Sequence, residues 1–171
     1  MGPQNLLVLE YHTQDIYSTY QTEQRMQDDG APGTPTVVFN GVNKIFGAVS
    51  YSQYRDKINS LLLAPSHVSL AASMTYTDQM YIDVSATDLG ASSVSNATLT
   101  AVIYQDIGTS QHHYVVRQML SDKLTSPLEQ SSTQQFHFTS QISRANAYLR
   151  VVVFLQAQSG QILQSVLATV Q

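Results

Sequence analysis

The chain has 171 residues, of which 43% are hydrophobic, so it can bury the core of one ordinary domain or two small ones. Its 8 Lys and Arg residues are scattered and its formal net charge is −4, which argues against nucleic acid as a partner because that binding needs clustered basic residues. Cysteine is absent, which excludes a disulfide framework, a Cys-ligated zinc site, a thiolate nucleophile and a dithiol redox centre.

Apolar patterning near the N-terminus predicts a strand followed by a helix. Residues 6–9 form a short apolar run (LLVL) of the kind found in buried strands. Ser18 and Gln21 have the spacing of a capping box, and Gly30 suits the position just past a helix end. These signals predict a helix over residues 19–29.

The following segment predicts a β-hairpin and a second helix. Residues 36–39 (TVVF) suit a strand, the Asn-Gly pair at 40–41 is a hairpin signal, and residues 44–48 suit the return strand. Ser50 and Gln53 again have capping-box spacing, and apolar residues at helical intervals follow them. The order of elements in this part is therefore strand, helix, strand, strand, helix.

The pattern changes at residues 63–66 (LAPS), where the proline ends the second helix and favours extended backbone before it. We predict a boundary there, with one domain over residues 1–65 and another over 66–171. The second domain reads as strands almost throughout, as does an immunoglobulin- or fibronectin-like β-sandwich of about seven strands. The expected strands cover residues 68–74, 80–87, 97–104, 114–119, 135–139, 147–156 and 161–169.

Residues 33–41 (GTPTVVFNG) resemble the C-terminal half of a thioredoxin fold. In that family a Gly-x-Pro-Thr segment carries a cis proline beside the active site and leads into a strand, a hairpin, a further strand and a last helix. The resemblance extends over about residues 5–63. It implies an α/β fold with the partial thioredoxin-like order β-α-β-β-α, a cis peptide at Pro35, and a second, all-β domain after it.

The chain departs from the thioredoxin family in one decisive respect. The family's first strand, first helix, second strand and Cys-x-x-Cys helix have no counterpart here, because the sequence begins after them. Thiol–disulfide exchange needs a thiolate, so this chain cannot perform it. The resemblance therefore assigns only a binding role to Thr34 and Pro35, whose backbone in the family lines a groove for an extended peptide.

The missing elements include a strand that would lie between residues 6–10 and 36–39. We expect those two segments to pair directly or to be completed by a strand from another copy of the chain, since unpaired backbone groups are costly. A half-domain of about 60 residues is also marginal on its own core. We therefore expect it to dimerise or to pack on the β-sandwich.

Residues 113–120 and 153–164 resemble a bacterial group in which a thioredoxin-like domain precedes a β-sandwich in exported or outer-membrane-associated proteins. The Lys-poor, Ser/Thr/Gln-rich composition is also typical of exported bacterial proteins. This implies a periplasmic, outer-membrane-associated or cell-surface location, although residues 1–4 have no features of a signal peptide. The chain has no apolar run near the length of about 20 residues that a membrane span needs.

Side chains that could bind metal or act as nucleophiles are present, but their patterns favour simpler roles. His112 and His113 could join His137, Asp106 or Asp122 around an ion, yet adjacent strand residues point to opposite faces, which favours a solvated turn. His12 and His67 are expected to be isolated. Three serines (Ser50, Ser66 and Ser110) lack the sequence context of a catalytic nucleophile.

Together these patterns predict no catalytic residue, no metal site and no cofactor. The first hypothesis is a non-catalytic fragment of an exported thioredoxin-like protein, whose sandwich serves as a binding or spacing module and whose partner is a protein or peptide. The alternative is a structural or adhesion-type surface module with no redox role. A groove beside Pro35 would favour the first hypothesis, and a continuous apolar patch on the sandwich would favour the second.

Overall fold

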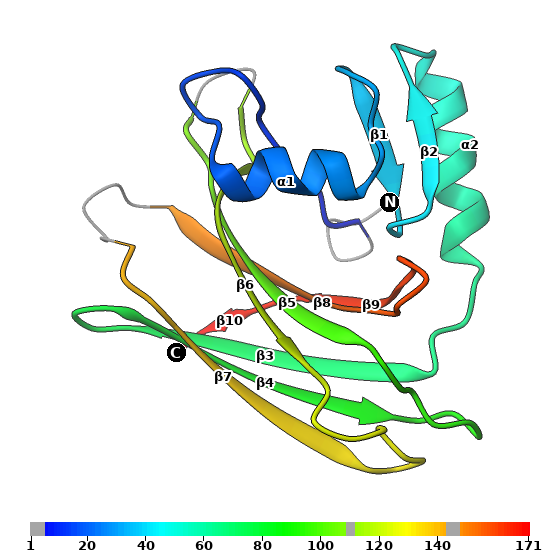
Figure 1. Cartoon of the computed structure of the whole chain (residues 1–171), viewed down its shortest axis with the longest axis vertical. Helices are drawn as coiled ribbons and strands as arrows, with labels where there is room; N and C mark the ends of the chain where they lie inside the picture. The colour runs from blue at the N-terminus through cyan, green and yellow to red at the C-terminus, as the bar shows by residue number, and fades with distance from the viewer. Residues whose placement is uncertain (1–5, 109–111, 143–147) are drawn as a thin grey trace.

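The computed structural model describes residues 6–108, 112–142 and 148–171. These residues form two helices, a two-stranded sheet and two four-stranded sheets (Figure 1). Both helices and the small sheet lie on one side of the pair of larger sheets. The elements in chain order are α1 (Tyr20–Asp28), β1 (Thr36–Phe39), β2 (Asn43–Phe46), α2 (Tyr51–Leu62), β3 (Val68–Tyr76), β4 (Met80–Asp88), β5 (Thr98–Gln105), β6 (Val115–Lys123), β7 (Thr133–Ser140), β8 (Leu149–Gln156), β9 (Ile162–Leu167) and β10 (Thr169–Val170).

Both predicted helices are present, and the capping box of α2 is formed by Ser50 and Gln53 as expected. The cap expected for α1 is wrong by one residue. Thr19 is the N-cap and exchanges hydrogen bonds with Thr22, whose hydroxyl also donates to the carbonyl of His12. Because Thr22 completes the capping box, the Gln21 side chain takes no part in it and instead binds the backbone of Met119 on β6.

The predicted hairpin joins β1 to β2 in antiparallel register through a loop of residues 40–42, which begins with Asn40 and Gly41. Both turn residues have positive φ, of 48° and 79°, as a type I′ turn requires. A Cβ atom at Gly41 would lie 2.1 Å from the carbonyl oxygen of Gly160, so this position also needs glycine for close approach. Strand β2 covers Asn43–Phe46 rather than residues 44–48.

Residues 6–9 do not form the expected regular strand. A single parallel bridge joins Glu10 to Val115 at the start of β6, and no pairing with β1 occurs within the described residues. The extended alternation is kept, since Leu7, Leu9 and Tyr11 pack inward while Leu6 and Val8 are about 40% exposed. The segment therefore pairs with β6 through this single bridge and not as a regular strand.

All the strands expected after residue 66 are present. One of them is divided into two strands, and the expected first residue of another lies outside the described residues. The strand expected over residues 161–169 divides into β9 and β10, which belong to different sheets. Buried Ala168 marks the crossing, and its N–H donates to Val151 on one sheet just before β10 pairs in parallel with β3 on the other. Residue 147, where another strand was expected to begin, is not described.

The two larger sheets have the orders β10-β3-β4-β7 and β6-β5-β8-β9 and share one apolar core. Along β3 and β4 buried and accessible residues alternate, as on a sheet with one covered face. Strands β5 and β8 instead contain continuous buried runs. A second apolar cluster therefore lies on the outer face of their sheet; its buried members are Val102, Tyr104, Val116, Val152 and Phe154.

The second cluster is covered by the N-terminal part of the chain. Leu7, Leu9 and Tyr11 pack against it, and α1 lies across the same sheet (Figure 1). The N-terminal part of the chain thus packs on the larger sheets, which was one of the outcomes expected from its small size. No helix among the described residues is long and apolar enough to cross a membrane.

Candidate binding surfaces

The loop at Thr34 and Pro35 lies at the end of the hairpin opposite its turn, and both side chains are exposed. The peptide bond between them is cis. Two hydrogen bonds fix the loop: the Thr36 hydroxyl donates to the Gly33 carbonyl at 2.5 Å, and the Gly47 N–H donates to the Pro35 carbonyl at 2.8 Å. The structure thus presents Thr34 and Pro35 to solvent on a constrained backbone.

The strand that follows this loop has an open side. Within the described residues β1 pairs with β2 alone, and none of its four residues is fully buried. Helix α2 contacts the other strand, where the Lys57 ammonium donates to the Asn43 side chain at 2.8 Å. The free edge of β1 is able to accept a further extended chain through backbone hydrogen bonds.

The N-terminal segment completes the edge of the sandwich sheet at β6. The Glu10 N–H donates to the Tyr114 carbonyl at 2.8 Å, and the Val116 N–H donates to the Glu10 carbonyl at 3.0 Å. Farther along β6, the side-chain amide of Gln21 binds both backbone groups of Met119, at 2.7 and 2.9 Å. The Glu10 backbone and the Gln21 side chain together satisfy hydrogen-bonding groups of the β6 backbone that would face water at an exposed strand edge.

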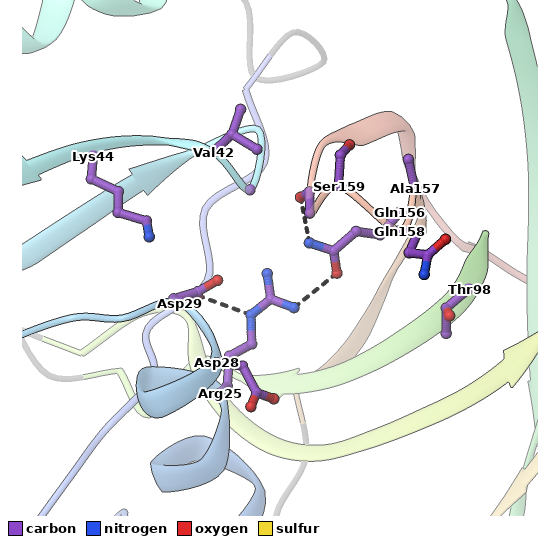
Figure 2. Close-up of a pocket in the computed structure, with 12 residues that line it drawn as sticks. Arg25, Asp28, Asp29, Val42, Lys44, Thr98, Gln156, Ala157, Gln158 and Ser159 are labelled. Carbon is purple, nitrogen blue, oxygen red and sulfur yellow. Dashed lines mark hydrogen bonds and ion pairs between the residues drawn. The ribbon is translucent and has the colours of Figure 1, made fainter. Parts of the chain in front are cut away.

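A polar pocket of about 540 Å³ lies where the N-terminal part meets the sandwich (Figure 2). Its walls come from the end of α1, the hairpin turn, and the turn between β8 and β9. Arg25 occupies its centre: the guanidinium donates to Asp29 at 2.9 Å and to the Gln156 side chain at 3.0 Å, and it lies 5.7 Å from the centre of the Phe154 ring. The backbone also connects the walls, because Ile162 N–H donates to the Asn40 carbonyl at 2.9 Å.

Partial burial shapes the electrostatics of this junction. Removal from water raises the pKa of the Asp29 carboxyl, and the neighbouring Arg25 opposes that rise. Burial likewise raises the pKa of the Tyr11 phenol to about 12, with the positive charge of Arg25 acting against it. None of the residues lining the pocket is a histidine, and Arg25 is already paired. The arrangement joins the two parts through the contacts of Arg25.

The structure separates the histidines that the sequence suggested as one group. His113 contacts Asp106 at 3.1 Å, and His137 contacts Asp83 on another sheet at 2.6 Å. His12 is not isolated as expected, since its ring lies 4.9 Å from that of His112, edge to face. The two adjacent residues have different neighbours just before β6: His112 lies beside Glu10 of the N-terminal segment, whereas His113 lies beside Asp106.

The other side chains considered from the sequence have structural roles or lie apart. Asp122 accepts a hydrogen bond from the Lys123 N–H, Ser50 caps α2, and Ser66 donates to backbone carbonyls beside β3. Ser110 lies outside the described residues.

No protein-family model and no curated protein sequence matches this chain. Among solved structures it is similar to HBP35 of Porphyromonas gingivalis, with 17% identity and a TM-score of 0.60 over 88% of this chain. A domain of the outer membrane lipoprotein Omp28 from the same organism has 13% identity and a TM-score of 0.43, over 63% of this chain and 91% of that one. The likeness to HBP35 concerns the fold alone, and this chain spans 58% of the HBP35 chain.

Proposed function

We propose that this chain is a non-catalytic part of an exported bacterial protein, in which residues 1–65 are a thioredoxin-like half-domain and residues 66–171 are a sandwich that supports it. The observation that carries the proposal is the distribution of buried residues. Within residues 6–65, all of which the structure describes, only Thr22 is fully buried, while Leu7, Leu9 and Tyr11 pack on the sandwich. The half-domain therefore depends on the sandwich for its apolar contacts.

The supported half-domain presents a peptide-binding loop. Thr34 and Pro35 are exposed on a constrained loop, and the neighbouring edge of β1 is open among the described residues. An extended polypeptide would add to this edge through its backbone, with the loop positioning one end. The chain has no cysteine, so the interaction is binding without thiol–disulfide exchange. Location at the periplasm, outer membrane or cell surface belongs to the same proposal and is supported by the composition.

The alternative of an adhesion-type module finds less support in the sandwich. Its discriminating feature would be a continuous apolar patch on the uncovered sheet. The described outward-facing residues of β3, β4 and β7 are mostly polar, with Tyr81 as the large exception. A second copy of the chain is the other possible occupant of the open β1 edge, which would give a homo-oligomer.

The experiment is a nuclear magnetic resonance titration of the isotopically labelled chain with reduced, carboxymethylated insulin B chain as an extended probe. We expect amide shifts at Gly33, Thr34 and residues 36–39. Thr34→Arg, which places bulk in the loop, should abolish them, whereas Thr139→Arg on the exposed side of β7 should not. Shifts confined to β3, β4 and β7, or no shifts, would contradict the proposal; light scattering of the same sample distinguishes a monomer from a β1-edge dimer.

A further inference from the structure

Away from the proposed peptide loop, three side chains converge where the N-terminal segment passes the start of β6. They are Glu10 and His12 from the segment and His112 from the sandwich. One potential ligand atom from each lies within 4.8 Å of the others. The cluster brings together residues about 100 positions apart in the chain, so it forms only when the N-terminal segment packs on the sandwich.

The Glu10 carboxylate occupies the centre of this cluster. Its Oε2 atom lies 3.7 Å from His12 Nε2 and 3.7 Å from His112 Nδ1. These distances are too long for hydrogen bonds, and the same oxygen is buried without a hydrogen-bond partner. A buried acceptor in that condition costs free energy unless something positive approaches it.

The orientation of His12 is set by Asp15 behind it. His12 Nδ1 lies 2.6 Å from Asp15 Oδ2, and a carboxylate can only accept, so the proton is on Nδ1. In the neutral tautomer with that proton, the Nε2 lone pair faces Glu10. The Asp15 carboxylate is itself fixed by the Tyr17 N–H at 2.8 Å and the Ser18 hydroxyl at 3.3 Å. Carboxylate, imidazole and an open ring nitrogen in this order are the arrangement that orients histidine ligands of metals.

The surroundings restrict the remaining freedom of both imidazoles. Tyr17 lies 5.2 Å from the His12 ring and 5.4 Å from the His112 ring, between centroids. The backbone of His112 is fixed by the Ile107 N–H, which donates to its carbonyl at 3.2 Å. His12 is 11% exposed, whereas Glu10 and His112 are about 30% exposed, so a small ion and a water molecule can reach the group.

We propose that Glu10, His12 and His112 bind a divalent transition-metal cation, for which Zn²⁺ is the best match. Two imidazole nitrogens and one carboxylate oxygen suit Zn²⁺, and three protein ligands leave a fourth position for water. Bonds of about 2.0–2.2 Å to a tetrahedral ion place ligand atoms about 3.3–3.6 Å apart. The two 3.7 Å separations from Glu10 exceed this value only slightly, and the ligand nitrogens of the two imidazoles, which lie within 4.8 Å of each other, must rotate inward to reach it. The bound ion fastens the N-terminal segment to the sandwich.

The test is titration of the whole chain, without an added histidine tag, with zinc chloride against a chromogenic chelator at pH 7.5. We expect one equivalent of zinc to bind and the melting temperature to rise, because the ion binds the folded chain. Glu10→Gln and His112→Ala should each abolish equimolar binding, and Asp15→Asn should weaken it by about 10-fold. His137→Ala removes an exposed histidine that is paired with an aspartate in a similar way, and should leave binding unchanged.

Binding that lacks a one-to-one end point, or that falls as much in His137→Ala as in His112→Ala, would overturn the proposal. Circular dichroism checks that each variant is folded. A second measurement needs no variant: the ring resonances of His12 and His112 should move on addition of zinc, while those of His137 stay in place. Movement of His137 or His113 instead of this pair would also overturn it.

Discussion

The two sheets of the sandwich have four strands each and share one core, but their outer faces differ. On β10-β3-β4-β7 the outward positions are mostly polar and accessible, whereas on β6-β5-β8-β9 they form a second apolar cluster. Figure 1 shows the reason: α1 and the N-terminal segment lie over one sheet only. A covered and an uncovered face in the same sandwich show that the N-terminal part is an integral layer of the fold.

The largest difference in stability between the two faces should appear when one aromatic side chain on each face is replaced by alanine. Phe154 is 2% exposed under Arg25, so Phe154→Ala should lower the free energy of unfolding by about 3–5 kcal/mol. Tyr81 is 38% exposed on the uncovered face, and Tyr81→Ala should cost about 1 kcal/mol or less. Urea unfolding of both variants measures this, and equal losses would mean that the covering layer contributes little.

The next largest loss of stability should come from a substitution in the hairpin turn, where the turn closely approaches the sandwich. Gly41 and Gly47 both have positive φ, but only at Gly41 does an added Cβ meet the Gly160 carbonyl. Gly41→Ala should therefore cost about 3 kcal/mol and Gly47→Ala about 1 kcal/mol, the latter from backbone conformation alone. Thermal or urea unfolding compares them. Similar losses in the two variants would show that the turn does not contact the sandwich.

Loss of the contact between α1 and β6 should lower the free energy of unfolding by a smaller but measurable amount. Gln21→Ala removes two hydrogen bonds and leaves the Met119 backbone unsatisfied, at a cost of about 1–3 kcal/mol. Gln24 lies on the same helix and only reaches Asp28 at its surface, so Gln24→Ala should be close to neutral. Unfolding curves of the pair test this contact, and a neutral Gln21→Ala would place α1 away from β6.

The smallest effect is a pH dependence that arises from Tyr11. Its folded-state pKa of about 12 exceeds the ordinary value of 10.0, so the unfolded chain loses the phenol proton first as pH rises. Stability is therefore fully present below pH 10 and declines between pH 10 and pH 12. Between pH 9 and pH 11 the wild type should lose about 1 kcal/mol more than Tyr11→Phe.

The matched control for Tyr11 is Tyr20→Phe, because Tyr20 is 80% exposed. It should show the same alkaline decline as the wild type. A decline that persists unchanged in Tyr11→Phe would place the Tyr11 phenol in water.

Local signals in the sequence predicted local structure well. The Ser50 capping box and the Asn40-Gly41 turn each depend on neighbouring residues, and both are present. Residues 6–9 failed as a strand because strand formation depends on a partner edge, which is set by tertiary packing. The sequence did contain a signal of the covered face, since residues 101–104 (AVIY) and 151–155 (VVVFL) are continuous apolar runs typical of strands buried on both faces.

The candidate sites also differ in whether their residues are neighbours in sequence or are brought together by tertiary packing. Thr34 and Pro35 could be singled out from one motif because all their neighbours are close in sequence. The cluster of Glu10, His12 and His112 could not, because it joins positions about 100 residues apart through an unforeseen contact. The adjacent pair His112–His113 pointed in the right direction. Of the partners suggested for it, Asp106 does contact His113, whereas His137 is paired with Asp83 on the other sheet.

Native-state hydrogen exchange at the β6 edge tests most directly whether the N-terminal part is a layer of this fold. The Val116 amide donates to the Glu10 carbonyl, and the Met119 amide donates to the Gln21 side chain. The account predicts that both amides exchange as slowly as amides in the centre of the sheet. Rapid exchange at both, as at a free strand edge, would contradict it.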